Sequence, residues 1–361
     1  MTVKNLKVGV VGASMDGGWA RYAHMPALAA IPEIDVVGIA TSRTESALRS
    51  AAAFNVRNGY GSIAELLASD VDLVAVSVRA PLHEQAAMEV VEAGKHLFVE
   101  WPMGANFAQS QRLVERARTR GVRGYVGLQG RASPAVQHAA ALLADGYLGR
   151  LYSVSLFGAF NFWNDPVATA YSADASCGAN ILTIPAGHGL DQMRMLVGEV
   201  ASVNARVSCL RESVMAADVG KMVPMTAPDQ VAAIGTLQSG AVFSAHFAGT
   251  APTGNTFRMM LVGDRGELLI EGNGMPEIAA LSLAGTREKG TALQPITVPE
   301  PALSGLAPGP SYNTTLLWHE IARDLREGTS NAPTLESACE TRRLLDAMER
   351  SAAQQGATIT L

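Results

Sequence analysis

Residues 6–19, with the sequence LKVGVVGASMDGGW, constrain the fold of this chain more than any other segment. An apolar run ends at Gly12, and an amphipathic segment begins at about Trp19. The turn between them is made of small residues, among them Ser14, Gly17 and Gly18. This order predicts a strand, a tight turn and a helix. Because small residues let backbone N–H groups close around a pyrophosphate at the positive end of a helix, the segment indicates a dinucleotide-binding domain.

The turn departs from the strict spacing G-x-G-x-x-G. Ser14 stands in place of the second glycine, and the third falls at Gly17. Spacing alone is a weak signal in a chain with 35 glycines, and an ordinary tight turn is the alternative interpretation. The position between the first predicted strand and a helix favours coenzyme binding, and a serine hydroxyl is able to donate to a phosphate oxygen. We therefore predict coenzyme contacts at Gly12, Ser14, Gly17, Gly18 and Trp19.

Three residues after the second predicted strand bear on the choice of coenzyme. Thr41, Ser42 and Arg43 occupy the place where NAD-specific proteins carry an acid for the ribose 2′-hydroxyl. A hydroxyl and a guanidinium are able instead to hold a 2′-phosphate through charge-assisted hydrogen bonds. This pattern favours NADP, with NAD as the other candidate. The alternative interpretation is a polar turn that opens a helix, with Thr44 as its N-cap.

Short apolar runs alternate with helical patterns from residue 6 to about residue 128. The predicted strands are 8–11, 36–40, 73–78, 97–99 and 125–128, and the predicted helices are 19–31, 44–54, 81–93 and 106–119. Strands that read as continuous Val and Leu are buried on both faces, so they indicate a parallel sheet covered by helices. Gly94 and Gly121 stand where helix ends are expected. The predicted fold class here is α/β, a Rossmann doubly wound parallel sheet.

The pattern changes after residue 150. Strand-like segments with partial period-two alternation follow at 151–160, 202–210, 231–237, 241–247, 258–262 and 268–270. Short turns separate them, which is typical of a large, mostly antiparallel sheet. Two helices are predicted at 314–327 and 335–354, the second with Thr334 as its cap. We expect an NAD(P)-binding domain at residues 1–130 and an α+β domain for substrate and oligomerisation at residues 131–361.

The composition argues against several classes of protein. With 48% hydrophobic and 17% charged residues among 361, the chain is expected to form packed cores. A net charge of −5 gives no electrostatic footprint for nucleic acid or an anionic membrane. No apolar run is long enough to span a bilayer, and the N-terminus lacks the pattern of a signal peptide. The three cysteines lie far apart and are expected to be buried free thiols, which favours a cytoplasmic protein.

Four further motifs carry a resemblance to a known family. They are PLHEQAAMEVVEAGKHLFVEWP (81–102), GLQGRASP (127–134), GHGLDQMRMLVG (187–198) and VGDRGELLIEG (262–272). In this order, across almost the whole chain, they resemble the glucose–fructose oxidoreductase / inositol dehydrogenase / rhizopine-catabolism (Gfo/Idh/MocA) family. The resemblance implies NAD(P)-dependent oxidoreduction of sugars, polyols and related compounds. Within the family, the chain is similar to the branch of the yeast galactose-regulon inhibitor, in which the scaffold binds NAD(P) but regulates a transcription factor.

The chain departs from the family pattern at two reactive positions. The family's Glu-Lys-Pro reads EWP here, so the lysine that acts near the reacting hydroxyl is replaced by the indole of Trp101. The family's Asp four residues before the active-site histidine is Ile184, whereas His188 and Asp191 match. Loss of one proton-transfer group typically costs about 10²–10⁴ in rate, so these changes are expected to weaken catalysis without necessarily abolishing it.

Each remaining candidate residue has a functional and a structural interpretation. His188 is the predicted acid/base residue, because histidine exchanges protons near neutral pH, but it is alternatively a satisfied structural histidine. Trp101 follows the end of a predicted strand, so it lines the pocket or packs in the core. The other predicted coenzyme contacts are Val78, Arg79, His83, Glu100, Trp101 and Gln129. The predicted substrate contacts are Trp101, Arg131, Asn161, Trp163, Asn180 and Asp191, with a domain-joining salt bridge as the alternative for Arg131. The other histidines show no metal-ligand spacing, and no metal is expected.

Three functions are therefore weighed. The first is an NAD(P)-dependent oxidoreductase that moves a hydride between the nicotinamide and a secondary alcohol or carbonyl of a sugar-like compound, with His188 exchanging the hydroxyl proton. The second is a non-catalytic NAD(P)-binding sensor, which Trp101 and Ile184 favour. The third, suggested by relatives, is an NAD-dependent glycosidase. A homodimer or homotetramer is expected, since an exposed antiparallel sheet is a natural pairing surface.

Overall fold

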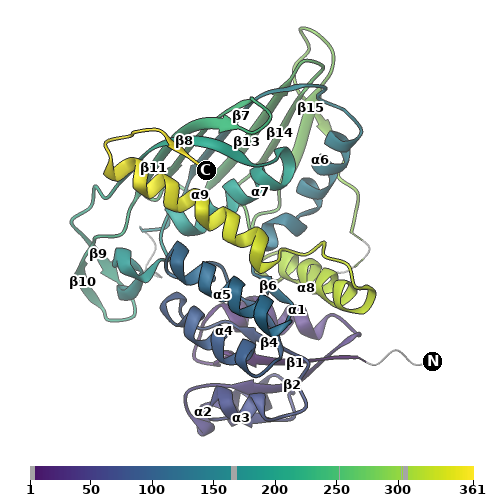
Figure 1. The fold of residues 1–361 in the computed structure, drawn as a ribbon, viewed down its shortest axis with the longest axis vertical. Helices are drawn as coiled ribbons and strands as arrows, with labels where there is room; N and C mark the ends of the chain where they lie inside the picture. The colour runs from purple at the N-terminus through teal and green to yellow at the C-terminus, as the bar shows by residue number, and fades with distance from the viewer. Residues whose placement is uncertain (1–4, 164–168, 252, 302, 304–307) are drawn as a thin grey trace. The chain divides into compact units, whose positions relative to one another are not determined.

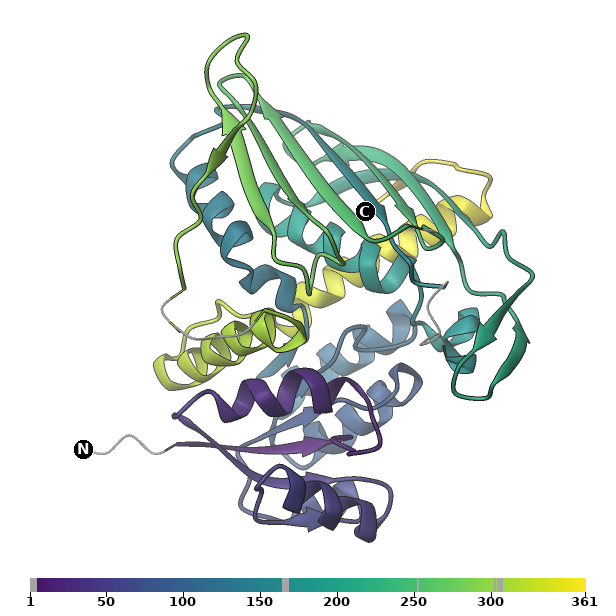
Figure 2. The same ribbon diagram turned by 180° about the vertical axis from the view of Figure 1, so that it is seen from behind.

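The computed structural model describes residues 5–163, 169–251, 253–301, 303 and 308–361 (Figures 1 and 2). By packing, the chain divides into two compact units. The first unit comprises Met1–Gln129 and Leu306–Cys339, and the second comprises Gly130–Gly305 and Glu340–Leu361. A boundary near residue 130 was predicted, and the return of residues 306–339 to the first unit was not. The coenzyme and substrate roles assigned to the two parts remain predictions.

The first unit contains a six-stranded parallel sheet in the order β3-β2-β1-β4-β5-β6. Its strands are β1 (Leu6–Val11), β2 (Ile34–Ala40), β3 (Gly59–Tyr60), β4 (Leu73–Val76), β5 (His96–Val99) and β6 (Gly124–Val126). All four residues of β4 are buried, as expected for a strand covered on both faces. The strand order reverses between β1 and β4, so the predicted Rossmann architecture is confirmed, and the crevice that binds ligands in such sheets is expected beside these two strands.

Helices connect the strands of the first unit. They are the π-helix η1 (Ala20–His24), α1 (Met25–Ala29), α2 (Thr44–Ala53), α3 (Ile63–Leu67), the 3₁₀ turn η2 (Ala80–Leu82), α4 (His83–Glu92), α5 (Phe107–Arg120) and α8 (Pro310–Glu327). Gly121 ends α5 in the left-handed conformation, as predicted. The predicted cap at Thr44 is wrong, because the N-cap of α2 is Arg43, which makes no side-chain capping bond. Helix α8 packs against η1 and α1, although nearly 300 residues separate them.

The second unit contains a nine-stranded sheet in the order β16-β15-β14-β13-β7-β12-β11-β8-β17. Its strands are β7 (Leu151–Ala159), β8 (Val200–Ser208), β11 (Gln230–Leu237), β12 (Val242–Ala248), β13 (Thr256–Gly263), β14 (Glu267–Gly272), β15 (Ser282–Thr286), β16 (Gln294–Ile296) and β17 (Ile359–Thr360). All neighbouring strands are antiparallel except β7 and β12, which run parallel. The prediction of a mostly antiparallel sheet is confirmed.

One face of this sheet carries the helices α6 (Pro134–Ala144) and α7 (Gly187–Val197), as Figure 1 shows. The second-unit part of α9 (Leu335–Ala353) also belongs to this layer. The opposite face exposes large apolar side chains, with Phe157, Ile234 and Val242 between 41% and 61% exposed. The burial of β12 alternates strictly along its first six residues, which is the pattern of a sheet with one covered face.

A hairpin that was not predicted projects from the second unit. It consists of β9 (Ser213–Ala216) and β10 (Lys221–Pro224), which pair only with each other. Short 3₁₀ turns, η4 (Ala170–Ala173) and η5 (Ala175–Cys177), lie beside it. A separate small core supports it, formed by Trp163, Ala173, Val214, Met225 and Ala227. The segment is too short to show a period-two pattern, so only tertiary packing defines it.

All three cysteines are free thiols. Cys177 and Cys339 are buried as expected, whereas Cys209 is exposed, so the prediction is wrong for Cys209. Among the residues that the structure describes, no helix is long and apolar enough to cross a membrane.

Candidate functional site

The glycine-rich turn after β1 has the backbone that its sequence predicts. Gly12, Gly17 and Gly18 adopt φ values of +95°, +138° and +104°, which side chains other than glycine rarely adopt. A Cβ atom at Gly12 would lie 2.3 Å from the carbonyl oxygen of Ser77, at the end of β4. The Cβ positions of Gly17 and Gly18 meet nothing within 4 Å. Glycine at position 12 therefore allows β1 and β4 to approach, while Gly17 and Gly18 leave bare backbone at the start of η1.

The hydroxyl of Ser14 organises the turn. It accepts a hydrogen bond from the backbone N–H of Asp16 at 3.1 Å. Asp16 in turn forms a bidentate ion pair with Arg49 of α2, at 2.7 and 2.6 Å. The N–H of Met15 donates to the hydroxyl of Ser50 on the same helix at 3.2 Å. These contacts tie the turn to α2, and the predicted contact of Ser14 with a phosphate remains a prediction.

Three polar atoms near the C-terminal ends of the parallel strands are buried but unpaired. They are Trp19 Nε1 after β1, Ser77 Oγ after β4 and Gln129 Oε1 after β6, and none has a hydrogen-bond partner among the described residues. Buried polar atoms in native proteins are nearly always paired, so each of these requires an explanation. A pyridine dinucleotide carries phosphate and hydroxyl oxygens and a carboxamide, which suit an indole donor, a hydroxyl and an amide oxygen. The residues at this edge of the sheet therefore fit such a coenzyme.

The residues at the end of β2 carry hydroxyls and a guanidinium but no acid. Ser42 and Arg43 are exposed, and Thr41 is half-buried. The hydroxyl of Thr41 donates to the carbonyl of Arg43 at 2.9 Å, which shapes the turn into α2. The guanidinium of Arg43 extends from this turn without a hydrogen bond to another described residue. The sequence-based assignment of these three residues to the coenzyme remains a prediction.

His83 joins the ends of β4 and β5. Its Nε2 lies 2.9 Å from the carbonyl oxygen of Val78, and its Nδ1 lies 2.7 Å from the carbonyl oxygen of Pro102. The ring is buried, while Arg79 beside it is exposed. A neutral imidazole has a single N–H, which donates to only one of the two carbonyls. His83 thus holds two backbone segments together, and its predicted coenzyme contact remains a prediction.

Glu100 follows β5 and takes part in a buried chain of polar side chains. Its Oε1 accepts a hydrogen bond from Nε2 of His24 on η1, and Nδ1 of His24 accepts one from Trp318 on α8 at 2.9 Å. His24 and Trp318 are fully buried. Trp101, the residue in place of the family's lysine, is itself only 5% exposed. Neither the contact of His24 nor that of Trp318 was predicted from the sequence, because no local pattern connects positions so far apart.

His188 lies in the first turn of α7. Its side chain is 4% exposed. Among the described residues, none forms a hydrogen bond with either ring nitrogen. Ile184, the position of the family's Asp, belongs to the preceding π-helix η6 (Leu182–Ala186). The imidazole therefore keeps both nitrogens available for other partners, which is compatible with its predicted acid/base role.

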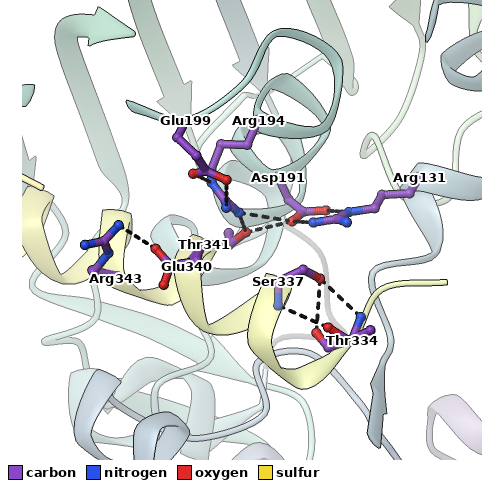
Figure 3. A network of polar contacts seen from close by, with 9 residues as sticks. All are labelled: Arg131, Asp191, Arg194, Glu199, Thr334, Ser337, Glu340, Thr341 and Arg343. Atoms are coloured by element: carbon purple, nitrogen blue, oxygen red, sulfur yellow. Dashed lines mark hydrogen bonds and ion pairs between the residues drawn. The ribbon is translucent and has the colours of Figure 1, made fainter. Parts of the chain in front are cut away.

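Asp191, one turn beyond His188, is the centre of a buried ionic network (Figure 3). Arg131 donates to both of its carboxylate oxygens at 2.6 Å. The hydroxyl of Thr341 donates to Oδ1 at 2.6 Å. Arg194 donates to Thr341 and forms a bidentate pair with Glu199. Arg131 and Asp191, both predicted to contact substrate, therefore satisfy each other within the second unit.

The electrostatics of this network follow from its burial. Burial alone raises the pKa of an aspartate, but the Arg131 charge and the hydrogen bonds from Arg131 and Thr341 outweigh it, so the pKa of Asp191 lies below its ordinary value. For Arg131, burial lowers the pKa, and the facing Asp191 carboxylate more than compensates, so the pKa is raised. Both side chains are consequently charged across the neutral range.

The other predicted substrate residues occupy different surroundings within the second unit. Asn180 accepts hydrogen bonds from the backbone N–H groups of Leu182 and Thr183 and so shapes the turn before η6. Trp163 is buried in the small core beside β9 and β10. Asn161 precedes it, and its side-chain oxygen is buried without a partner among the described residues. The local contacts of Asn180 and Trp163 are structural, and substrate contact by these three residues remains a prediction.

Comparisons with known proteins agree with this architecture. Residues 6–128 match the model of the oxidoreductase family with an NAD-binding Rossmann fold, and residues 134–272 match that of the Gal80p C-terminal domain. The chain is 32% identical over 283 residues to dehydrogenase aclE of Aspergillus oryzae, covering 74% of this chain and 77% of that protein. It is 28% identical over 313 residues to the galactose/lactose metabolism regulatory protein GAL80 of Saccharomyces cerevisiae, covering 78% and 71%.

A solved structure supports the fold over the full length. Levoglucosan dehydrogenase in complex with NADH and levoglucosan matches with a TM-score of 0.85 at 23% identity, covering 99% of both chains. The fold and the edge of the six-stranded sheet thus define a Rossmann-type oxidoreductase scaffold. The chain belongs to the NAD-binding Gfo/Idh/MocA oxidoreductase family, whose members similar to it include both dehydrogenases and a regulatory protein.

Proposed function

We propose that this protein is an NAD(P)-dependent dehydrogenase or reductase acting on a CH–OH group, or the corresponding carbonyl, of a sugar, polyol or related compound. The observation that carries the proposal is the set of buried unpaired atoms on Trp19, Ser77 and Gln129, which follow the C-terminal ends of β1, β4 and β6. They surround the edge of the sheet at which dinucleotides bind in this architecture. The similarity to a dehydrogenase over 74% of the chain supports it.

The coenzyme would be held by residues of the first unit. The backbone N–H of Gly18 would receive the pyrophosphate, and Gly17, whose own N–H donates to the carbonyl of Ser14 at 3.4 Å, would leave room for it. The Trp19 indole would donate to the pyrophosphate or to a neighbouring oxygen. Ser77 and Gln129 would form hydrogen bonds with the remaining polar groups of the coenzyme. Ser77 was not identified from the sequence, because it follows a strand without any motif. Val78, Arg79, His83, Glu100 and Trp101 complete the proposed binding edge. When bound, the nicotinamide supplies or accepts the hydride.

NADP is the proposed preference over NAD. No acidic side chain follows β2 at the position that would bind a ribose 2′-hydroxyl, and Thr41, Ser42 and Arg43 stand there instead. The exposed guanidinium of Arg43 is available for the 2′-phosphate. The family assignment itself establishes only NAD-type coenzyme binding.

His188 is the proposed proton-transfer residue. Its ring is nearly buried and forms no hydrogen bond with another described residue, so both nitrogens are available to a substrate hydroxyl or carbonyl. Asp191 would act through His188, because its ion pair with Arg131 anchors the helix that carries both residues. Trp101 would shape the pocket, since an indole offers one donor and a flat apolar face.

The test is a screen of polyols, aldoses and keto-sugars with NADP⁺, NAD⁺ and their reduced forms, following the absorbance of the reduced nicotinamide. Turnover of at least one compound is expected. With that substrate, His188→Ala should lower kcat by about 10²–10⁴ while coenzyme affinity is unchanged. Wild-type activity in this variant would remove His188 from the mechanism.

The second candidate function is a coenzyme-binding regulator. Similarity to GAL80 over 78% of the chain and the presence of Trp101 and Ile184 at the two reactive positions favour it. In the same screen, measurable affinity for the coenzyme without turnover of any compound would establish this function over the first.

We extend the proposal to the self-association of the chain and to its location in the cell. The exposed apolar side chains of Phe157, Ile234 and Val242 lie on the uncovered face of the nine-stranded sheet, and a second copy packed on this face would give the expected homodimer or homotetramer. A cytoplasmic location and the absence of nucleic-acid and membrane partners remain predictions from composition. Sedimentation of the wild type and of Ile234→Arg would test the interface, with dissociation of the variant expected.

A further inference from the structure

The chain Trp318, His24 and Glu100 joins three segments of the first unit that are far apart in the sequence. His24 lies on η1 after the glycine-rich turn, Glu100 follows β5, and Trp318 lies on α8. His24 and Trp318 are 0% exposed, and the side chain of Glu100 is 11% exposed. Exposure thus rises along this chain of polar groups from Trp318 and His24 to Glu100. Glu100 follows β5, at the edge of the sheet where ligands bind in Rossmann folds.

The hydrogen bonds fix the tautomer of His24. An indole N–H only donates, so Nδ1 of His24, at 2.9 Å from Trp318 Nε1, must accept with its lone pair. The ring proton is therefore on Nε2, and Nε2–H donates to Oε1 of Glu100. Phe98 holds both rings, stacking on Trp318 at 4.7 Å between centroids and meeting His24 edge-on at 5.1 Å. The tautomer and the ring plane are thus set by buried groups of the protein itself.

The other side of the Glu100 carboxylate is confined by backbone. A Cβ atom at Gly127 would lie 2.5 Å from Oε2, so only glycine leaves room for this oxygen. The N–H of Trp101 lies within 3.2 Å of Oε2. A carboxylate has about four acceptor positions, and the described residues use two of them. The carboxylate is therefore held in one place with acceptor capacity left over.

We propose that Trp318 and His24 are positioning residues that fix Glu100 as an acceptor for a hydroxyl group at the reaction end of the coenzyme site. The hydroxyl belongs either to the ribose of the coenzyme or to the sugar-like substrate. Glu100 immediately precedes Trp101, where the ammonium group of the family's lysine is missing. With that cation replaced by an indole, the carboxylate is the charged group that remains at the end of β5. The proposal rests on the proposed function, because it assumes a bound dinucleotide.

Three variants separate the parts of this chain. Glu100→Gln keeps the size of the side chain and removes its charge. Trp318→Phe removes the indole donor and keeps a ring that is able to stack on Phe98, although the smaller side chain leaves space at this fully buried position. Gly127→Ala keeps every functional group, and its new methyl must displace the Glu100 carboxylate, which is the flexible end of a side chain. Glu89→Gln, an exposed change of the same charge on α4, is the matched control.

The first measurement is the ¹⁵N spectrum of the His24 ring. The wild type should show the Nε2–H tautomer. Trp318→Phe should shift the Nδ1 resonance, because this nitrogen loses its hydrogen-bond donor, whereas Trp163→Phe, at a buried indole without a hydrogen bond to described residues, should leave the spectrum unchanged. A wild-type ring protonated at Nδ1 would overturn the positioning role. This readout requires neither coenzyme nor turnover, so it stands even if the proposed function fails.

The second measurement is calorimetric affinity for NADPH and NADH, followed by kcat and KM with the best substrate. Loss of one hydrogen bond to a charged acceptor should weaken the affected step roughly 10-fold to 100-fold in Glu100→Gln and Gly127→Ala. Weaker coenzyme affinity assigns the hydroxyl to the ribose, and unchanged affinity with a raised KM or lowered kcat assigns it to the substrate. If the wild type binds no coenzyme, the proposed function fails. If the wild type binds and turns over while Glu100→Gln and Gly127→Ala match Glu89→Gln in every constant, this inference alone is refuted.

Discussion

Glu100 and Asp191 are both buried carboxylates, but their partners differ. Asp191 receives two hydrogen bonds from Arg131 and one from Thr341, and its side chain is 1% exposed. Glu100 receives one from a neutral imidazole and one from the adjacent backbone N–H, and its side chain is 11% exposed. Asp191 is surrounded by permanent cations that neutralise it, whereas Glu100 is held in position with acceptor capacity to spare. The first arrangement suits stability, and the second suits a ligand.

The largest loss of stability is expected when Asp191, the carboxylate with more hydrogen-bond donors around it, is removed. Asp191→Ala leaves Arg131 buried without its counter-charge and removes the group that Thr341 serves. Breaking a buried pair in this way costs about 3–5 kcal/mol in the free energy of unfolding. Urea denaturation of the purified variant measures the loss. The control is Glu340→Gln, which breaks the exposed pair with Arg343 and should cost at most about 1 kcal/mol. Equal losses in the two variants would contradict the contrast drawn between buried and exposed pairs.

A smaller loss should follow when one hydroxyl group of the same network is deleted and both charged groups stay in place. Thr341→Val keeps the shape of a fully buried side chain and removes the hydroxyl that donates to Asp191 and accepts from Arg194. A hydrogen bond to a charged group contributes about 1.5–3 kcal/mol, so the free energy of unfolding should fall by that amount. Coenzyme affinity should be unchanged, because Thr341 belongs to the second unit. A weakened coenzyme affinity with unaltered stability would assign this network to the ligand.

The surroundings of Glu100 and Asp191 also differ in how far a single sequence predicts them. The glycine-rich turn was predicted because strand, turn and helix are adjacent in the chain, and the left-handed glycines confirm it. The ion pair of Arg131 and Asp191 was not predicted. A salt bridge was considered for Arg131 only as a link between domains, whereas this pair lies within the second unit, and the distance in space between two motifs does not follow from their spacing in the sequence.

The features that escaped prediction all depend on contacts between distant segments. His24 and Trp318 meet only because α8 returns to pack on η1. The parallel pairing of β7 with β12 was hidden because period-two alternation is the same in parallel and antiparallel strands that have one exposed face. Ser77 was missed because a small polar residue after a strand is common, and only its burial without a partner distinguishes it.

An exposed residue of the first unit should affect binding and leave stability unchanged. Arg43→Ala removes a guanidinium that forms no hydrogen bond with described residues, so the free energy of unfolding should change by less than about 0.5 kcal/mol. Affinity for NADPH should fall roughly tenfold or more, while affinity for NADH should stay the same, because only the 2′-phosphate loses a partner. Calorimetric titration with both coenzymes measures the ratio. An equal decrease for both would remove the argument for NADP.

The smallest effect on the free energy of unfolding near neutral pH is expected from the titration of Asp191. Its pKa in the folded state lies below the ordinary value of 3.8, so the unfolded chain binds the proton more readily than the folded chain. The stability contributed by the ionised carboxylate is therefore complete above about pH 3.8 and is lost as the pH falls through the lowered folded value. The raised pKa of Arg131 adds nothing in this range, because arginine is charged in both states. The difference in unfolding free energy between wild type and Asp191→Asn should accordingly be constant from pH 7 to 5 and shrink only in acid. A difference that already shrinks between pH 7 and 5 would mean that Asp191 does not have a lowered pKa, and the contrast with Glu100 would then need another physical basis.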